Sequence, residues 1–210
     1  MILNQKKTKV MIFNFTNNYQ FSTRLKLENE NLEIIKETKL LGVIVTDDLK
    51  WENNTKYLIR KAYKRMEILR QAVKFGAPLE DKKIIYILYV RSVLEQSCQV
   101  WNSRLTEQNI TDLERVQKSA LRLIINKQYD DYNSALDMIN LQTLEERRKY
   151  ICIRFAKNSL HGEKTEKMFP LKRNKQNTIK GEKFKVNHAK TDRYKKSSIP
   201  YMQRLLNHYQ

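Results

Sequence analysis

Glycine is scarce in this chain, with only 4 glycines among 210 residues. Loops that approach a ligand closely or hold strained backbone conformations depend on glycine, so the sequence offers few places for them. It contains no glycine-rich phosphate loop, no H-E-x-x-H motif and no Ser, His, Asp set around a recognisable nucleophile elbow. The residues therefore give no sign of these familiar catalytic sites.

Cysteine and long apolar runs are scarce as well. Cys98 and Cys152 are far apart in the sequence, and neither lies at metal-ligand spacing from the three histidines, so we expect buried thiols in a reducing compartment rather than a zinc site. No segment approaches 18 continuous apolar residues, and the N-terminal sequence MILNQKKTKV carries charge where a signal peptide needs an apolar core. These features predict an intracellular protein, cytoplasmic or nuclear.

Positive charge dominates what is present. Lys and Arg number 41 against 23 Asp and Glu, which gives a formal net charge of +18. Such a field favours a polyanionic partner, and nucleic acid is the first expectation. An anionic membrane is the rival, but no basic amphipathic segment stands alone at a terminus as an anchor would. We therefore expect nucleic acid and no membrane as the partner.

The stretch KLLGVIVTDDLKW at Lys39–Trp51 divides two kinds of pattern. Upstream, short β-prone runs predict a small antiparallel sheet of three or four strands within residues 8–45. Gly42 interrupts an apolar run where a strand bulges or lets another backbone come close. The stretch therefore predicts a strand or hairpin edge that leads into a helical domain.

Downstream the apolar residues recur at steps of three and four, which predicts a bundle of four or five helices. Capping boxes at Thr111–Glu114 and Thr143–Glu146 mark two helix starts, and the second of these helices extends through Leu160. The other helices are expected at Glu52–Lys74, Glu80–Trp101 and Ser134–Ile139.

The region 162–199 loses this periodicity and holds 12 Lys or Arg against 4 Asp or Glu. It is either a solvated, disordered extension or a tail that orders on nucleic acid. The fold class is thus α+β: a small sheet, a mainly helical bundle and a basic flexible tail. The predicted divisions are 1–48, 49–161, 162–199 and a short C-terminal helix in 200–210.

Two pairs of aspartates are candidate metal ligands. Asp47 and Asp48 follow a strand, where a two-metal polymerase site would hold Mg²⁺. They also begin a helix, and capping explains carboxylates there without a metal, so we favour the capping interpretation. Asp130 and Asp131 lie in a turn between helices and are read in the same way.

An ordered set of motifs resembles the C-terminal part of the reverse transcriptase of non-LTR, jockey-like retrotransposons. No single motif is specific, but their order and spacing cover most of residues 1–160. The motifs are N-x-x-K-T-K-V-M at Asn4–Met11, K-x-L-G-V with D-x-L-x-W at Lys39–Trp51, an L-Y, L-E and V-W run across Leu88–Trp101, L-E-R-V-Q-K-x-A-L-R at Leu113–Arg122 and L-x-T-L-x-x-R-R at Leu141–Arg148.

The resemblance implies an RNA-directed DNA polymerase whose metal-binding aspartates lie upstream of the N-x-x-K-T segment. The chain is then expected to be a fragment with the end of the palm, the thumb and a C-terminal extension. It would be inactive alone, with no catalytic residue, metal ligand or cofactor of its own, and Mg²⁺ expected only in the complete enzyme. The expected partners are an RNA·DNA hybrid or structured RNA and the missing palm and fingers.

The resemblance also implies contact residues. Lys7 matches a late-palm lysine near the incoming nucleotide, and Leu41 with Gly42 matches the primer grip; a solvated lysine and a plain strand bulge are the alternatives. A thumb-like surface would grip phosphates through basic side chains, although charge runs are often only solvated helix faces. The candidates are Lys56, Arg60, Lys61, Lys64, Arg65, Arg147 and Arg148, while Tyr57, Tyr63 and Trp101 are expected in the core.

Two other readings remain open. The chain could be an independent basic helical module that binds RNA or DNA without a polymerase and is stable as a monomer. It could instead be a remnant without activity, which would expose an apolar face on the sheet of residues 8–45.

Overall fold

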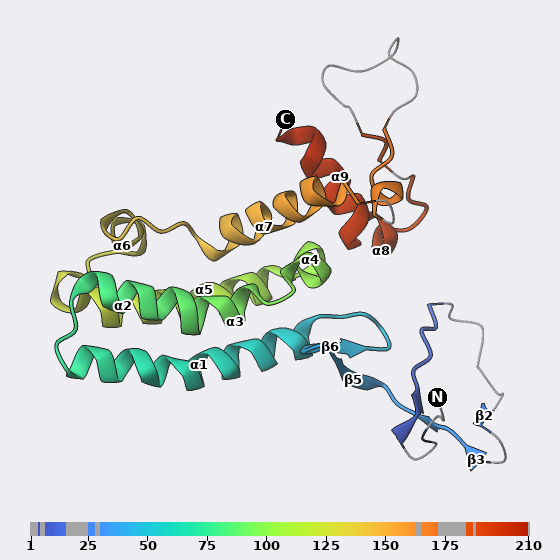
Figure 1. Ribbon diagram of the computed structural model, residues 1–210, viewed down its shortest axis with the longest axis horizontal. Coiled ribbons are helices and arrows are strands. Elements are labelled where there is room, and N and C mark those ends of the chain that lie inside the picture. The colour runs from blue at the N-terminus through green and yellow to red at the C-terminus, as the bar shows by residue number, and fades with distance from the viewer. Residues whose placement is uncertain are drawn as a thin grey trace, which may run out of the picture. The chain divides into compact units, whose positions relative to one another are not determined.

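A computed structural model describes residues 4, 7–15, 25–27, 30–162, 165–171, 184–186 and 188–209. The chain divides into two compact units, an N-terminal unit of Met1–Tyr57 and a helical unit of Leu58–Gln210. Strands occur in the first and helices make up most of the second, so the expected mixed α+β class is confirmed (Figure 1). Within the described residues, no helix is both long and apolar enough to cross a membrane.

In the described residues of the N-terminal unit, the strands form three separate pairs rather than one antiparallel sheet. The pair β1–β4 is parallel, whereas β2–β3 and β5–β6 are antiparallel. The predicted single antiparallel sheet is therefore wrong: most of these runs are only two residues long, and in the described residues no strand joins one pair to another. The strands are β1 (Lys9–Val10), β2 (Lys26–Leu27), β3 (Glu30–Asn31), β4 (Glu33–Ile34), β5 (Glu37–Leu40) and β6 (Val43–Thr46).

A two-residue turn joins β5 to β6. Leu40 pairs with Val43, and the turn residues Leu41 and Gly42 have φ values of 48° and 87°. Positive φ at both positions is what a type I′ hairpin requires, and its twist suits the flanking strands. Gly42 is thus a hairpin residue, and the expectation of a bulge within a strand is wrong.

Helix α1 (Glu52–Lys74) has the predicted bounds. Its buried side chains, among them Leu58, Ala62, Met66 and Leu69, recur at the three- and four-residue steps of an amphipathic helix. Gly76, with φ 70°, follows its C-terminal end, where a left-handed residue commonly stops a helix.

The second expected helix is divided into one continuous stretch and a separate short helix. Helix α2 (Leu79–Ile85) continues as a π-helical turn, η2 (Tyr86–Arg91), and as α3 (Ser92–Glu95); α4 (Cys98–Trp101) follows separately. The break falls at Ser97, which has φ 52°. The single long helix predicted from sequence is therefore wrong. The sequence did not predict the break because neither glycine nor proline marks it.

Three further helices complete the bundle, with 3₁₀ turns η3 (Asn102–Arg104) and η4 (Asn126–Gln128) in their connections. Helix α5 (Glu107–Ile125) is capped by Thr106, so Thr111 lies inside it and the first capping box is wrong. Helix α6 (Tyr132–Met138) is capped by Asp131. Helix α7 (Leu144–Ser159) begins with the predicted Thr143–Glu146 capping box, which is confirmed.

A partly buried polar network ties these helices together. Tyr86 donates to Gln117 at 2.5 Å, and Gln117 in turn donates to Tyr132 at 2.9 Å. Tyr132 donates to Glu114 at 2.5 Å, and the other carboxylate oxygen of Glu114 accepts the backbone N–H of Glu145 at 2.8 Å. Paired in this way, buried polar groups help to fix one arrangement of the bundle.

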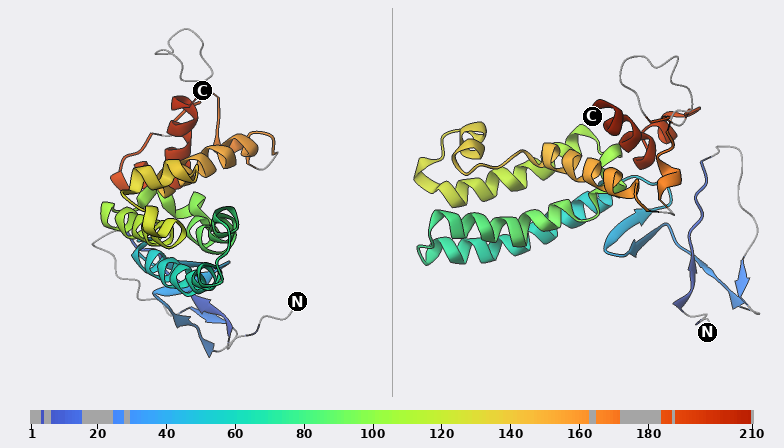
Figure 2. Two further views of the ribbon diagram at one scale, coloured as in Figure 1. Left: turned by 90° about the vertical axis from the view of Figure 1, so that its left-hand side faces the viewer. Right: turned by 45° about the horizontal axis from the view of Figure 1, so that its top comes forward.

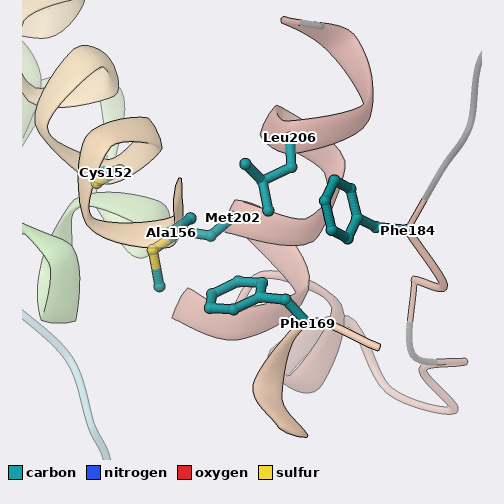
Figure 3. Close-up of a cluster of buried hydrophobic side chains, with 6 residues drawn as sticks. All are labelled: Cys152, Ala156, Phe169, Phe184, Met202 and Leu206. Carbon is teal, nitrogen blue, oxygen red and sulfur yellow. The ribbon is translucent and has the colours of Figure 1, made fainter. Parts of the chain in front are cut away.

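The C-terminal region docks on α7 through an apolar cluster (Figure 3). Asn207 clamps the backbone of Phe184, accepting its N–H at 2.9 Å and donating to its carbonyl at 3.0 Å. Phe169 and Phe184 come from the region expected to be a flexible tail, yet both are buried. The cluster joins Cys152 and Ala156 of α7, Phe169, Phe184, and Met202 and Leu206 of α9 (Ser198–His208); η5 (Glu166–Met168) and α8 (Asp192–Lys195) lie in the same region.

Candidate nucleic-acid interface

The outer face of α1 presents a row of cations. Lys56, Arg60 and Lys64 are all exposed and follow one another at four-residue steps. A four-residue step keeps side chains on one face and advances about 6 Å along the helix axis. Because the opposite face of α1 is buried, the pattern that forms the core also places these three cations toward solvent.

Two of the predicted α1 cations also make contacts within the helical unit. Lys61 donates to the side chain of Gln96 at 3.2 Å, and Arg65 donates to the carbonyl of Tyr89 at 3.3 Å. Both are only half-buried, but their polar ends fasten α1 to the segment from η2 to α3. We therefore regard them as structural contacts of the bundle more than as surface cations.

The β5–β6 hairpin is fixed to the start of α1 within the N-terminal unit. Lys39 donates to the hydroxyl of Tyr57 at 2.7 Å, and the backbone N–H of Ile44 donates to Asn54 at 3.0 Å. The turn itself stands out from this support, since the side chain of Leu41 is 92% exposed. A bulky apolar residue that is both exposed and left-handed is uncommon, so Leu41 is a candidate contact.

Asp48 caps the turn before α1. Its carboxylate accepts the hydroxyl of Thr46 at 2.7 Å and the backbone N–H of Lys50 at 3.0 Å. Partial burial acts to raise the pKa of Asp48, but the hydrogen bonds from Lys50 and Thr46 hold that pKa below its ordinary value. Because α1 begins at Glu52, Asp48 stabilises the turn ahead of the helix and does not cap the helix itself, so the predicted helix cap is wrong. In the described part of the chain, no group of three or more His, Cys, Asp or Glu side chains could hold a metal ion.

Arg147 is tied into an ion-pair cluster. Its Nε lies 3.1 Å from Glu95, and the same carboxylate oxygen lies 3.3 Å from Nε of Arg91. The guanidinium also lies 5.6 Å from the ring centroid of Tyr150. Because Glu95 is mostly buried and balances part of this charge, Arg147 has less positive charge to offer a phosphate than the α1 cations.

Arg148 lies in the core with no exposed surface. Its Nε donates to Asn102 at 2.9 Å, and its guanidinium lies 6.0 Å from the ring centroid of Trp101. A side chain without surface cannot contact a nucleic acid in this conformation, so the prediction for Arg148 is withdrawn. The sequence pattern missed this because basic residues are buried only rarely.

The remaining predicted residues differ in their exposure. Lys7 is exposed, beside Thr8, whose hydroxyl donates to the carbonyl of Asn4 at 2.9 Å. Trp101 is completely buried, as expected of a core residue, whereas Tyr63 is exposed and its core prediction is wrong.

The sequence analysis did not predict two contacts between a cation and an aromatic ring. Lys118 lies 4.8 Å from the ring centroid of Tyr132, and Arg122 lies 5.2 Å from that of Tyr129. Cations on aromatic faces can share those rings with a stacked base. The available signal was the Y-D-D-Y sequence that begins at Tyr129, shortly after the basic face of α5.

Helices α7 and α9 lie against each other in the helical unit (Figure 2). A pocket of about 540 Å³ lies where they meet. Its lining combines cationic Lys149 and Arg204 with the rings of Tyr201, His208 and Tyr209. Such a lining suits an anionic group attached to a flat ring. Sequence reasoning missed the pocket because it did not foresee that α9 packs on α7.

Comparisons of the chain with protein-family models, with curated proteins and with solved structures found no match.

Proposed function

We propose that the chain grips a nucleic-acid duplex as the thumb-like part of a non-LTR retrotransposon reverse transcriptase. The proposal joins the resemblance of its motifs to one structural observation, the exposed row of Lys56, Arg60 and Lys64 on α1. The row extends about 12 Å along the helix axis, enough to meet several phosphates of one strand. Arg148 has no part in this surface.

The surrounding charge supports the same function. Residues 58–210 contain 32 Lys or Arg and 16 Asp or Glu, so the helical unit carries most of the net positive charge. Phosphate contacts of this kind carry little sequence information and weaken as salt rises. The chain would therefore select the shape of a duplex rather than its sequence.

The hairpin turn at Leu41 and Gly42 would contribute a different contact. An apolar side chain at an exposed tip can pack on a sugar or base at the end of a primer strand, which a charged residue would do less well. The strained φ of Leu41 is consistent with such a role, since unfavourable backbone conformations persist more often at functional sites.

The N-terminal unit would pack on the rest of a polymerase palm. Several large apolar side chains of its described residues are exposed, including Phe13, Phe15 and Ile34. Exposed apolar groups of this size are typical of a surface that meets another protein surface. The same exposure is what an inactive remnant would show, so binding must decide between the two.

The test is to titrate the purified chain into a fluorescent RNA·DNA hybrid, single-stranded RNA and duplex DNA over a salt series. The proposal expects a hybrid preference that persists at about 0.15 M salt. If the three ligands bind alike and all binding disappears together as salt rises, charge alone explains it and the duplex grip is wrong. Equally tight binding of single-stranded RNA at that salt, by a stable monomer, would instead favour an independent RNA-binding module.

A further inference from the structure

The pocket between α7 and α9 follows from the spacing of residues along α9. Tyr201, Arg204, Leu205 and His208 stand at steps of three and four, so they share one face of the helix. All four line the pocket. The neighbouring face of α9 carries the side chains that enter the apolar cluster with α7 (Figure 3). The packing that docks α9 therefore also places a cation and two aromatic rings at the pocket.

A further wall of the pocket comes from the short segment around Lys185. The N–H of Lys185 donates to the carbonyl of Pro170 at 2.8 Å. Asn207 accepts the N–H of Phe184 at 2.9 Å and donates to the carbonyl of the same residue at 3.0 Å. These bonds fix the backbone beside Val186, which lines the pocket. The wall is therefore held by hydrogen bonds as well as by the apolar cluster.

Two cations from different helices meet at the pocket. Lys149 of α7 lies 2.8 Å from Glu145, and these side chains are 39% and 43% exposed. An ion pair this exposed is weak, and the ammonium has three donors, so it can also bind a ligand oxygen. Arg204 of α9 donates Nη2 to the carbonyl of Lys195 at 2.8 Å, which uses one of its five N–H donors. Together they suit an anion with several oxygens, and a guanidinium matches phosphate geometry well.

The aromatic rings favour a flat group next to that anion. The rings of His208 and Tyr209 are perpendicular, with an interplanar angle of 89° and centroids 5.0 Å apart. A flat ligand ring that stacks on Tyr209 would therefore lie perpendicular to His208, so the two rings form a corner. Tyr209 is 50% exposed and has surface available for stacking. Tyr201 is held from outside this corner by Asn102, which donates to its hydroxyl at 3.4 Å.

We propose that the pocket binds one nucleotide, with its phosphate between Lys149 and Arg204 and its base on the ring of Tyr209. The volume of about 540 Å³ falls within the range of small-ligand sites, about 300–1,000 Å³. A free nucleotide and one nucleotide of a single strand offer the same chemistry. The pocket is formed without the cations of α1, so this inference does not rest on the duplex grip.

The experiment titrates the full chain with adenosine 5′-monophosphate, adenosine, inorganic phosphate and phenyl phosphate by calorimetry, at about 0.15 M salt. We expect saturable binding of one adenosine 5′-monophosphate per chain. Adenosine and phosphate should each bind at least about tenfold more weakly, because each keeps only one of the two contacts. If the nucleotide shows no saturable binding, or inorganic phosphate or phenyl phosphate binds as tightly as the nucleotide, the proposal is overturned.

A short single strand of adenylates distinguishes the two sources of the nucleotide. Because a polyanion can bind a chain of net charge +18 at many places, competition with adenosine 5′-monophosphate is the readout. A strand that displaces the bound nucleotide with at least equal affinity shows that the pocket takes a nucleotide of a strand. A strand that binds without displacing it shows that the pocket takes the free nucleotide.

Variants with matched controls place the binding in this pocket. Lys149→Gln and Lys157→Gln each remove one cation of α7, and of the two only Lys149 lines the pocket. Tyr209→Ala and Tyr150→Ala each remove a tyrosine that is about half exposed, at 50% and 51%, and of the two only Tyr209 lines the pocket.

The two pocket variants should weaken binding of adenosine 5′-monophosphate at least about fivefold, since each removes one contact to the ligand. The two controls should change it less than about twofold, because a charge outside the pocket is screened at this salt. An equal effect within either pair overturns the proposed site.

Discussion

The N-terminal unit and the helical unit differ in both charge and burial. Residues 1–57 hold 9 Lys or Arg and 7 Asp or Glu, whereas residues 58–210 hold 32 and 16. Most of the completely buried apolar side chains belong to the helical unit, while exposed ones such as Phe13, Ile34 and Leu40 recur in the N-terminal unit. The same chain thus contains one region that buries its own core and another with little core of its own.

The difference shows which sequence patterns can form stable structure without further partners. An amphipathic helix forms its hydrogen bonds internally and needs only neighbours for its apolar face, which the helical unit supplies. A two-residue strand depends on its pairing partner and on a packed face, and such short pairs are marginal alone. This contrast underlies the proposal that the N-terminal unit packs on a further polymerase surface.

Matched leucine truncations give the largest expected contrast. Leu113→Ala removes a completely buried side chain of α5 and should lower the free energy of unfolding by about 3 kcal/mol. Leu40→Ala removes a side chain that is 61% exposed and should change it by less than about 0.5 kcal/mol. Chemical denaturation followed by far-ultraviolet circular dichroism measures both. Similar losses for the two variants would contradict the difference in burial between the units.

Helix caps give an intermediate effect within the helical unit. Thr143→Ala removes the side-chain oxygen that accepts the backbone N–H of Glu146, and should cost about 1 kcal/mol. Thr111→Ala, at the other Thr-x-x-Glu sequence, lies inside α5 and should be neutral or slightly stabilising, because alanine favours a helix interior. Thermal unfolding compares them. A loss at Thr111 as large as that at Thr143 would mean that α5 begins later than described.

The hairpin turn gives a smaller stability change than loss of the Thr143 cap, and one of the opposite sign. Leu41→Asn places a residue that tolerates positive φ into a type I′ turn and should stabilise the hairpin by roughly 0.5–1 kcal/mol. If Leu41 contacts nucleic acid, the same variant should weaken hybrid binding. Hydrogen exchange of the β5–β6 amides measures the first effect, and hybrid titration the second. Greater protection with unchanged binding would remove Leu41 from the interface.

Sequence periodicity predicted most helices of the helical unit but not their interruptions. The bounds of α1 and the capping box of α7 follow from strong local patterns. The break at Ser97 carries no glycine or proline signal, and the true start of α5 lies upstream of a more conspicuous capping sequence. Local rules therefore predicted which segments are helical more reliably than where the chain bends.

The candidate site could be predicted only in part, because exposure depends on tertiary packing. The spacing of Lys56, Arg60 and Lys64 predicted that they share one outer helix face, and all three are exposed on α1 in the structure. Arg148 carries the same charge pattern but lies on the face of α7 that meets α4, and its burial could not be read from composition.

The central claim is that the outer face of α1 supplies the phosphate contacts, and two variants with equal charge change test it. One reverses Lys56, Arg60 and Lys64 to Glu; the other reverses Lys190, Lys195 and Lys196, which are also exposed but lie near the C-terminus. The account predicts that the α1 variant binds the RNA·DNA hybrid at least about tenfold more weakly than the control. The slope of log binding constant against log salt concentration should also fall by about 2 to 3 more in the α1 variant than in the control. Equal losses of affinity and slope in the two variants would contradict the account.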